Sequence, residues 1–178
     1  TRSGEVVKLI DLINEGKTRM ADSLRDRAKE GKTPLSDDDG SIEHAASIIG
    51  TGAIKYADLK NNPATDYAFS YDKMLSTQGD TAVYLLFAYA RVASILRKAN
   101  TEKGKNLSTL MNYDNALNIL NAYPLTHPAE RALAFELMQL GDVIRSVLKD
   151  LLPNRLCDYL KALSVRFTDF VSKCNVLH

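Results

Sequence analysis

The sequence predicts an all-α protein, a helical connector region followed by a helical bundle. Apolar residues recur at steps of three and four in every long segment, which is the period of an amphipathic helix. No stretch alternates apolar and polar residues convincingly with the period of two that marks a half-buried strand. The 178 residues are 45% hydrophobic and 25% charged, which is typical of a globular protein with a sizeable core.

Composition gives no argument for binding nucleic acid. The net charge is +1, and residues 79–178 hold 12 Lys and Arg against 9 Asp and Glu. Any RNA binding would therefore depend on local placement of charge, and we expect no DNA partner. No apolar run approaches the about 20 residues of a membrane span, so no membrane partner is expected. Two cysteines, Cys157 and Cys174, fit a reducing compartment and are too few for a metal site; Cys157 is interpreted as a small packing residue.

Two helices are predicted in the first third of the chain. The first covers about residues 5–29, although Gly16 weakens the pattern at its centre. The loop 31–40 contains an Asp run, but its acids are out of register for a calcium-binding EF-hand loop. Ser41 is expected to cap a second helix over residues 42–58. Within it, Gly50 and Gly52 superficially resemble a phosphate loop; we interpret them instead as small residues that allow close helix packing.

An ordered connector over residues 55–75 leads to the turn-rich loop 76–81, where Asp80 or Thr81 can cap the next helix. That helix is predicted over residues 82–99. Two adjacent rows of apolar residues run along it, one of Ala82, Leu86, Tyr89, Ala93 and Leu96, the other of Leu85, Ala88, Val92, Ile95 and Ala99.

A third row on the same helix, Tyr84, Phe87, Arg91, Ser94 and Lys98, combines aromatic rings with cationic and hydroxyl groups. Such a row could stack an unpaired base and hold its phosphate. The alternative is that Tyr84 and Phe87 belong to the core and that Arg91 is merely solvated. Spacing alone leaves both interpretations open.

The remaining chain predicts a polar turn at 100–106, a helix at 113–122, and a helix from Pro128 to Gly141 with a continuation that ends at Pro153. A last helix carries an apolar stripe from Leu156 to Cys174. The boundary between the connector and the bundle is placed near Gln78 and Gly79.

No complete active site is visible in the sequence. The three histidines, His44, His127 and His178, are far apart and are interpreted as surface or capping residues. The chain contains no HExxH pattern, nucleophile elbow, P-loop or CxxC motif.

Four segments resemble arginyl-tRNA synthetases of the class I, eukaryotic cytosolic type. GDTAVYLLFAYARVASILRKA is similar to the Gly-Asn-Thr-Ala-x-Tyr-Leu-x-Tyr-Ala-x-Ala-Arg pattern that opens the family's anticodon-binding domain. KYADLKNNPATDYAFSYDKML resembles the connector from its catalytic domain, and TRSGE the tail of its signature loop. LLPNRLCDYLKALSVRFTDFVSKC resembles a late helix of the anticodon domain. The segments follow the family's order and are distributed along nearly the whole chain, from residue 1 to residue 174.

The resemblance implies two domains. Residues 1–78 would be the C-terminal end of the class I catalytic domain with stem-contact helices and connector. Residues 79–178 would be the all-α anticodon-binding domain, cut off before the family's terminal helix. The chain would recognise tRNA(Arg) within a cytoplasmic ligase that joins L-arginine to its tRNA using ATP with Mg. Because the nucleotide fold and the HIGH motif are missing, the fragment alone is expected to bind no cofactor and to be inactive.

The resemblance also implies site residues. Thr1 and Arg2 would end the signature loop, or be only a frayed terminus. The unstacked anticodon would be received by Ser76, Thr77, Gln78, Gly79, Asp80, Thr81, Tyr84, Phe87 and Arg91. Asp80 stands where the family usually has Asn, and Phe87 where Tyr is common. Tyr159 is either a further aromatic contact or a structural tyrosine.

A rival interpretation is an all-α protein–protein interaction module. Its apolar helix faces would bind partners, and a dimer of the chain through exposed apolar faces is a related alternative. RNA binding with steep salt dependence distinguishes the first interpretation from the second.

Overall fold

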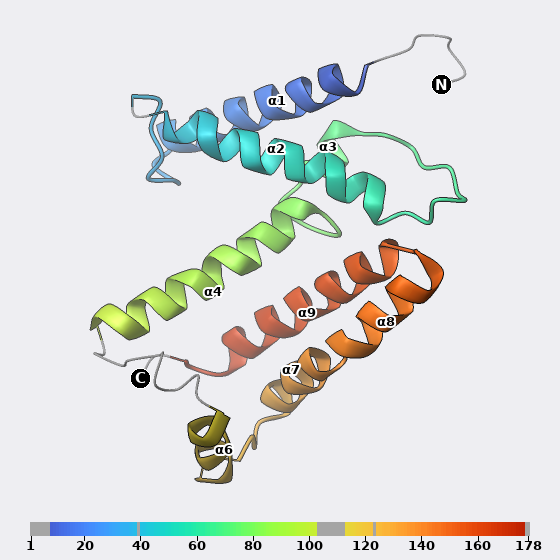
Figure 1. The fold of residues 1–178 in the computed structure, drawn as a ribbon. Helices are drawn as coiled ribbons and strands as arrows, with labels where there is room; N and C mark the ends of the chain where they lie inside the picture. Colours follow the sequence, from blue (N-terminus) through green and yellow to red (C-terminus); the bar gives the residue numbers. More distant parts are fainter. Residues whose placement is uncertain (1–7, 39, 103–112, 123, 177–178) are drawn as a thin grey trace. The chain divides into compact units, whose positions relative to one another are not determined.

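The computed structural model describes residues 8–38, 40–102, 113–122 and 124–176. Every regular element within these ranges is an α-helix, which confirms the predicted all-α class (Figure 1). None of the described helices combines the length and the hydropathy of a membrane span. The chain divides into two compact units, Thr1–Leu86 and Phe87–His178.

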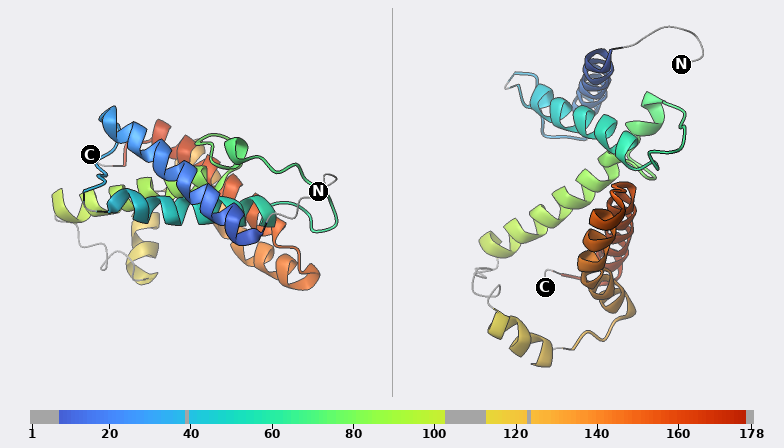
Figure 2. Two further views of the ribbon diagram at one scale, coloured as in Figure 1. Left: turned by 90° about the horizontal axis from the view of Figure 1, so that it is seen from above. Right: turned by 45° about the vertical axis from the view of Figure 1, so that its right-hand side comes forward.

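The first unit is built on an antiparallel pair, α1 (Leu9–Lys29) and α2 (Ser41–Leu59), which lie side by side in Figures 1 and 2. Helix α1 runs through Gly16 without a break. It begins at Leu9 rather than near residue 5, because Lys8 has an extended backbone with φ −69° and ψ 142°. The core of the pair is formed by Met20, Ala21, Leu24, Ile42 and Ala46.

The two helices approach most closely at Gly50. A Cβ atom added there would lie 2.8 Å from the backbone N and Cα of Lys17. The facing residue on α1 is Gly16, whose added Cβ would lie 3.5 Å from the carbonyl oxygen of Gly50. This contact confirms that Gly50 serves close helix packing. The same interpretation is wrong for Gly52, where the nearest atom to an added Cβ is a Leu86 methyl at 4.0 Å. The contact at Gly50 also explains why a glycine is present inside each helix despite its low helix propensity.

The start of α2 differs from the prediction that Ser41 would cap it. Gly40 is the N-cap residue, with a left-handed φ of 68°, and Ser41 is already helical. The Ser41 hydroxyl turns back to the loop instead, where it accepts a hydrogen bond from the Ser36 N–H (2.9 Å) and donates one to the Ser36 carbonyl (3.1 Å). The loop is thereby closed on itself before the helix begins.

The connector after α2 contains a short helix, α3 (Tyr71–Met74), that was not predicted. Ser70 caps it by accepting the N–H of Lys73 at 3.4 Å. Met74 is buried against Ile54 and Ala57 of α2. Four residues span little more than one turn, so this helix shows no periodicity in the sequence and is defined by its packing.

Helix α4 (Ala82–Glu102) begins in the first unit and continues into the second. It includes Asn100–Glu102, which were predicted to form a turn. Of its two apolar rows, the one with Ala88 and Ala99 is the buried side. In the other row, Tyr89 and Leu96 are exposed.

The second unit also contains α6 (Tyr113–Ala122), α7 (Pro128–Met138), α8 (Leu140–Asp150) and α9 (Asn154–Lys173). Helix α6 has the predicted bounds. Helices α7 and α8 meet at Gln139, where a helix continuing to Gly141 was expected. Helix α9 packs along both of them (Figure 2).

Polar contacts support this packing. Arg166 on α9 lies 3.8 Å from the Glu136 carboxylate on α7, and Arg155 near the start of α9 pairs with Asp150 at the end of α8. Cys157 is buried, as its interpretation as a packing residue required. His127 caps α7: its ring accepts the Ala129 N–H at 3.1 Å, which confirms a capping role for this histidine.

Candidate nucleic-acid interface

The loop before α4 is closed by Thr81, which is only 5% exposed. Its hydroxyl donates to the Ser76 carbonyl oxygen at 2.7 Å and accepts the Tyr84 N–H at 3.1 Å. One side chain therefore joins the two ends of the loop and satisfies a backbone donor in the first turn of the helix. Of the two predicted capping residues, Thr81 is the one that caps.

The outer part of the loop is open to solvent. Thr77, Gln78 and Gly79 are exposed, and the Gln78 N–H donates to the Ser76 hydroxyl at 3.1 Å. Gly79 has a φ of +84°, a conformation that L side chains rarely adopt. The loop thus presents a short exposed tip between internally bonded ends.

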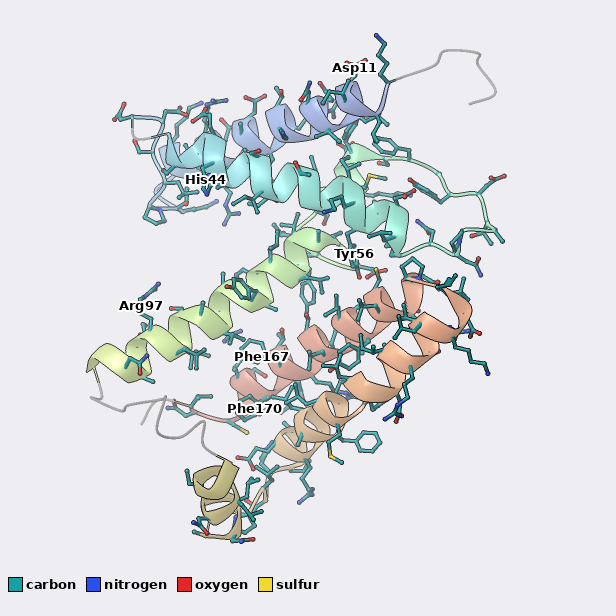
Figure 3. All side chains as sticks on the ribbon, viewed as in Figure 1. Asp11, His44, Tyr56, Arg97, Phe167 and Phe170 are labelled. Atoms are coloured by element: carbon teal, nitrogen blue, oxygen red, sulfur yellow. The ribbon has the colours of Figure 1, made fainter. Side chains whose placement is uncertain are left out.

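Asp80 has partners that the sequence did not indicate. Its carboxylate accepts the Tyr56 hydroxyl at 2.7 Å and lies 3.6 Å from the Lys60 ammonium; Lys60 also donates to the Asp80 carbonyl oxygen at 2.7 Å. Both partners lie near the end of α2, where Figure 3 labels Tyr56. They are 24 and 20 residues from Asp80 in the sequence, so no local pattern could have identified them.

The aromatic and basic row on α4 is open over most of its length. Phe87 is 61% exposed and Arg91 is exposed, whereas Tyr84 is half-buried. Tyr84 lies in the first unit, and Phe87 and Arg91 lie in the second. Because a core phenylalanine would be largely covered, the exposure of Phe87 disfavours the core alternative for this residue.

Tyr159 is in a different environment. It is 6% exposed on α9, and burial, followed by the charge of Glu136, raises the pKa of its hydroxyl. This burial favours the structural interpretation of Tyr159 over a surface contact.

The other candidate residues form no further site. Thr1, Arg2 and His178 lie outside the described residues, and His44 is exposed on α2 (Figure 3). Within the described ranges, no group of three or more His, Cys, Asp or Glu side chains is arranged to hold a metal ion.

Two family descriptions match consecutive parts of the chain. Residues 85–178 match the family described as DALR anticodon binding domain. Residues 1–71 match the description tRNA synthetases class I (R), catalytic domain. The loop 76–81 lies between the two matched ranges.

Curated relatives match nearly the whole chain. The cytoplasmic arginine–tRNA ligase of Arabidopsis thaliana is 43% identical over 99% of this chain, which covers 27% of that protein. The chloroplastic/mitochondrial arginine–tRNA ligase of the same plant is 42% identical over 99% of this chain and 25% of its own length. The arginine–tRNA ligase of Crocosphaera subtropica is 43% identical, again over 99% of this chain and 28% of that protein. The chain therefore spans about a quarter of the length of these relatives.

Two solved structures are similar to the chain over most of its length. The arginyl-tRNA synthetase of Plasmodium falciparum matches with a TM-score of 0.74 and 31% identity, over 97% of this chain and 28% of the other. The Thermus thermophilus enzyme matches with a TM-score of 0.70 and 26% identity, over 93% of this chain and 24% of the other. With its family match over residues 85–178 and its similarity to arginyl-tRNA synthetases over nearly all of its length, the chain belongs to the DALR anticodon binding domain family.

Proposed function

We propose that this chain is the tRNA(Arg)-recognition part of an arginine–tRNA ligase. The whole protein would activate L-arginine with ATP and Mg and then transfer the arginyl group to the terminal ribose of the tRNA. The chain's own contribution is to position the tRNA. We place the start of the anticodon-binding domain at Gly79, in the loop before α4, between the two ranges that the family descriptions match.

The observation that carries this proposal is the exposed Phe87 and Arg91 on α4, in the first turns of the range that matches the anticodon binding family. An exposed ring offers a face on which an unpaired base can stack, and a guanidinium one turn further on can hold its phosphate. The loop Ser76–Thr81 and Tyr84 are the other residues proposed to contact the anticodon. As a buried residue, Tyr159 would support the bundle from within.

The test is binding of tRNA(Arg) to the 178-residue chain, measured by fluorescence anisotropy over a range of salt concentrations. We expect binding that weakens steeply as salt rises, because phosphate contacts release counterions. A tRNA(Arg) whose anticodon bases are replaced should bind at least about tenfold more weakly, since stacking and base-edge contacts are lost. Equal affinity for both tRNAs would contradict the anticodon assignment.

We propose further that the whole protein is of the eukaryotic cytosolic type and acts in the cytoplasm. This proposal rests on the segment TRSGE at residues 1–5, because cytoplasmic, organellar and cyanobacterial relatives are 42–43% identical to the chain and favour no type. Aminoacylation of cytosolic and organellar tRNA(Arg) by the whole protein, measured side by side, tests it. A preference for the organellar tRNA would contradict it.

A second candidate function is a protein–protein interaction module, including a dimer of the chain. It is favoured by exposed apolar side chains on α7 and α8, among them Phe135 (64%), Met138 (78%) and Leu148 (68%). Large exposed apolar patches often mark protein interfaces. Sedimentation over a range of concentrations tests it: salt-insensitive dimers without RNA binding would favour this function over the first.

A further inference from the structure

The contacts of Asp80 join the end of α2 to the loop before α4, both within the first unit. Tyr56, which is only 8% exposed, donates its hydroxyl proton to the carboxylate at 2.7 Å. Lys60 contacts both the carboxylate (3.6 Å) and the carbonyl oxygen (2.7 Å) of the same residue. Asp80 is therefore held at its side chain and at its backbone.

These contacts anchor the loop from outside. Within the loop, Thr81 bonds Ser76 and caps α4. Asp80 precedes Thr81 directly, so its anchoring to α2 fixes the point at which the loop enters the helix. The exposed tip of the loop, Thr77–Gly79, is therefore followed directly by two residues, Asp80 and Thr81, whose positions are fixed by hydrogen bonds.

The same contacts neutralise a charge that opposes RNA binding. A free carboxylate in this loop would repel a phosphate. Lys60 lies beside the carboxylate, and the side chains of Lys60 and Asp80 are each 29% exposed. A cavity of about 200 Å³, lined in part by Tyr56, Lys60 and Asp80, adjoins the pair. Both side chains are therefore partly accessible to solvent, and a change in the charge of either one would alter the electrostatic potential at the loop.

We propose that Tyr56 and Lys60 are positioning residues for tRNA binding: from the C-terminal end of α2 they fix Asp80 and neutralise its carboxylate, so that an RNA phosphate can approach the loop Ser76–Thr81. The proposal rests on the proposed function of this loop. It adds two residues that lie outside the range matched by the anticodon binding family. Lys60 acts through Asp80 and need not touch the RNA.

The test compares tRNA(Arg) binding by Lys60→Met, Asp80→Asn and the double variant of the 178-residue chain. At about 0.05 M salt, Lys60→Met should bind about five- to tenfold more weakly, as one uncompensated charge near a phosphate predicts. At about 0.3 M salt the loss should shrink to less than about twofold, since the repulsion is screened. The double variant, Lys60→Met with Asp80→Asn, should bind within about twofold of the Asp80→Asn single variant, because the repelling carboxylate is absent from both.

Two further variants distinguish the effect of the contacts to Asp80 from the effect of the chain's net charge on tRNA binding. Lys55→Met makes the same change of net charge on the same helix, at an exposed residue, and should change binding by less than about twofold. Tyr56→Phe keeps the ring and removes the hydroxyl that donates to Asp80. It should weaken binding about threefold at both salt concentrations, because one hydrogen bond is lost and no charge changes. Melting temperatures measured for every variant identify any that do not fold.

The double variant is the decisive sample. If it binds as weakly as Lys60→Met, or if Lys60→Met or Tyr56→Phe binds like the unchanged chain, the proposal is overturned. If Lys55→Met loses as much affinity as Lys60→Met, net charge explains the effect and the proposal is again overturned. The proposed function fails separately, when the unchanged chain does not bind tRNA(Arg) or when Phe87→Ala binds it with full affinity.

Discussion

At the scale of single residues, substitution of the exposed Phe87 distinguishes a role in tRNA recognition from a role in the core, because the two roles predict different effects on stability and on binding. Because 61% of this residue is already exposed, Phe87→Ala should change the free energy of unfolding by less than about 1 kcal/mol. If the ring stacks on a base, the same change should weaken tRNA(Arg) binding about ten- to hundredfold.

A matched control lies two residues further along α4. Tyr89 is 72% exposed but lies on another side of the helix, so Tyr89→Ala should leave both stability and binding nearly unchanged. Melting temperature and binding anisotropy are measured for both variants. A Phe87→Ala chain that melts much earlier yet binds tRNA normally when folded would contradict the anticodon assignment.

Tyr159 predicts a dependence of stability on alkaline pH. Burial, followed by the charge of Glu136, raises the pKa of this hydroxyl in the folded chain. The folded state therefore keeps the proton to higher pH than the unfolded state. The resulting stability is fully present below the ordinary tyrosine pKa of about 10 and is lost as the pH rises through the raised value.

We expect the urea midpoint to fall between about pH 9 and pH 11, and Tyr159→Phe to reduce that fall because it removes the titrating group. Tyr67 and Tyr71 in the first unit also have a raised pKa, in both cases chiefly through burial, so part of the fall should remain. Tyr89→Phe, at an exposed position, should keep the whole fall. An unchanged pH profile in Tyr159→Phe would contradict the prediction.

At the scale of helices, the α1–α2 pair depends on close backbone approach at Gly50. A methyl group there would lie 2.8 Å from backbone atoms of Lys17, which cannot move aside as a flexible side chain could. Gly50→Ala should therefore destabilise the first unit by about 1–3 kcal/mol through overpacking, despite the higher helix propensity of Ala.

Gly52, one half-turn away on α2, is the matched control. The nearest atom to an added Cβ there is a Leu86 methyl at 4.0 Å, so the side chain has room. Gly52→Ala should be neutral or stabilising by up to about 1 kcal/mol, from propensity alone. The urea midpoints of both variants are measured by circular dichroism. Equal midpoints would contradict the prediction, because they would show that the close approach at Gly50 does not contribute to the free energy of unfolding.

At the scale of the whole molecule, the chain alone should not activate arginine. Its match to the catalytic domain covers only residues 1–71, and its described parts are helical, whereas a class I nucleotide site requires a parallel sheet. We expect no arginine-dependent exchange of pyrophosphate into ATP above background. Exchange that persists in a purified sample and depends on arginine would contradict this expectation.

Local rules account for what the sequence alone determined. The helical class, the bounds of α6 and a cap at Asp80 or Thr81 depend on residues within one or two turns of each other, so periodicity and capping chemistry predict them. The structure then decides that Thr81 is the residue that caps. The interpretation of Gly50 and Gly52 as packing residues is confirmed for Gly50 and wrong for Gly52, because only Gly50 faces the backbone of α1 at close range. The short helix α3 and the start of α2 at Gly40 were missed, because loop and packing contacts outweigh local propensity there.

The tertiary structure alone decided which candidate side chains are exposed. Phe87, Tyr89 and Tyr159 are all aromatic residues of predicted helices, yet two are exposed and Tyr159 is buried, because exposure depends on which helix covers each face. The partners of Asp80 could not be predicted either: Tyr56 lies in α2 and Lys60 directly follows it, and only folding brings them to the loop. Periodicity identifies the faces of a helix, but the identity of their neighbours is set by long-range packing, which no local pattern encodes.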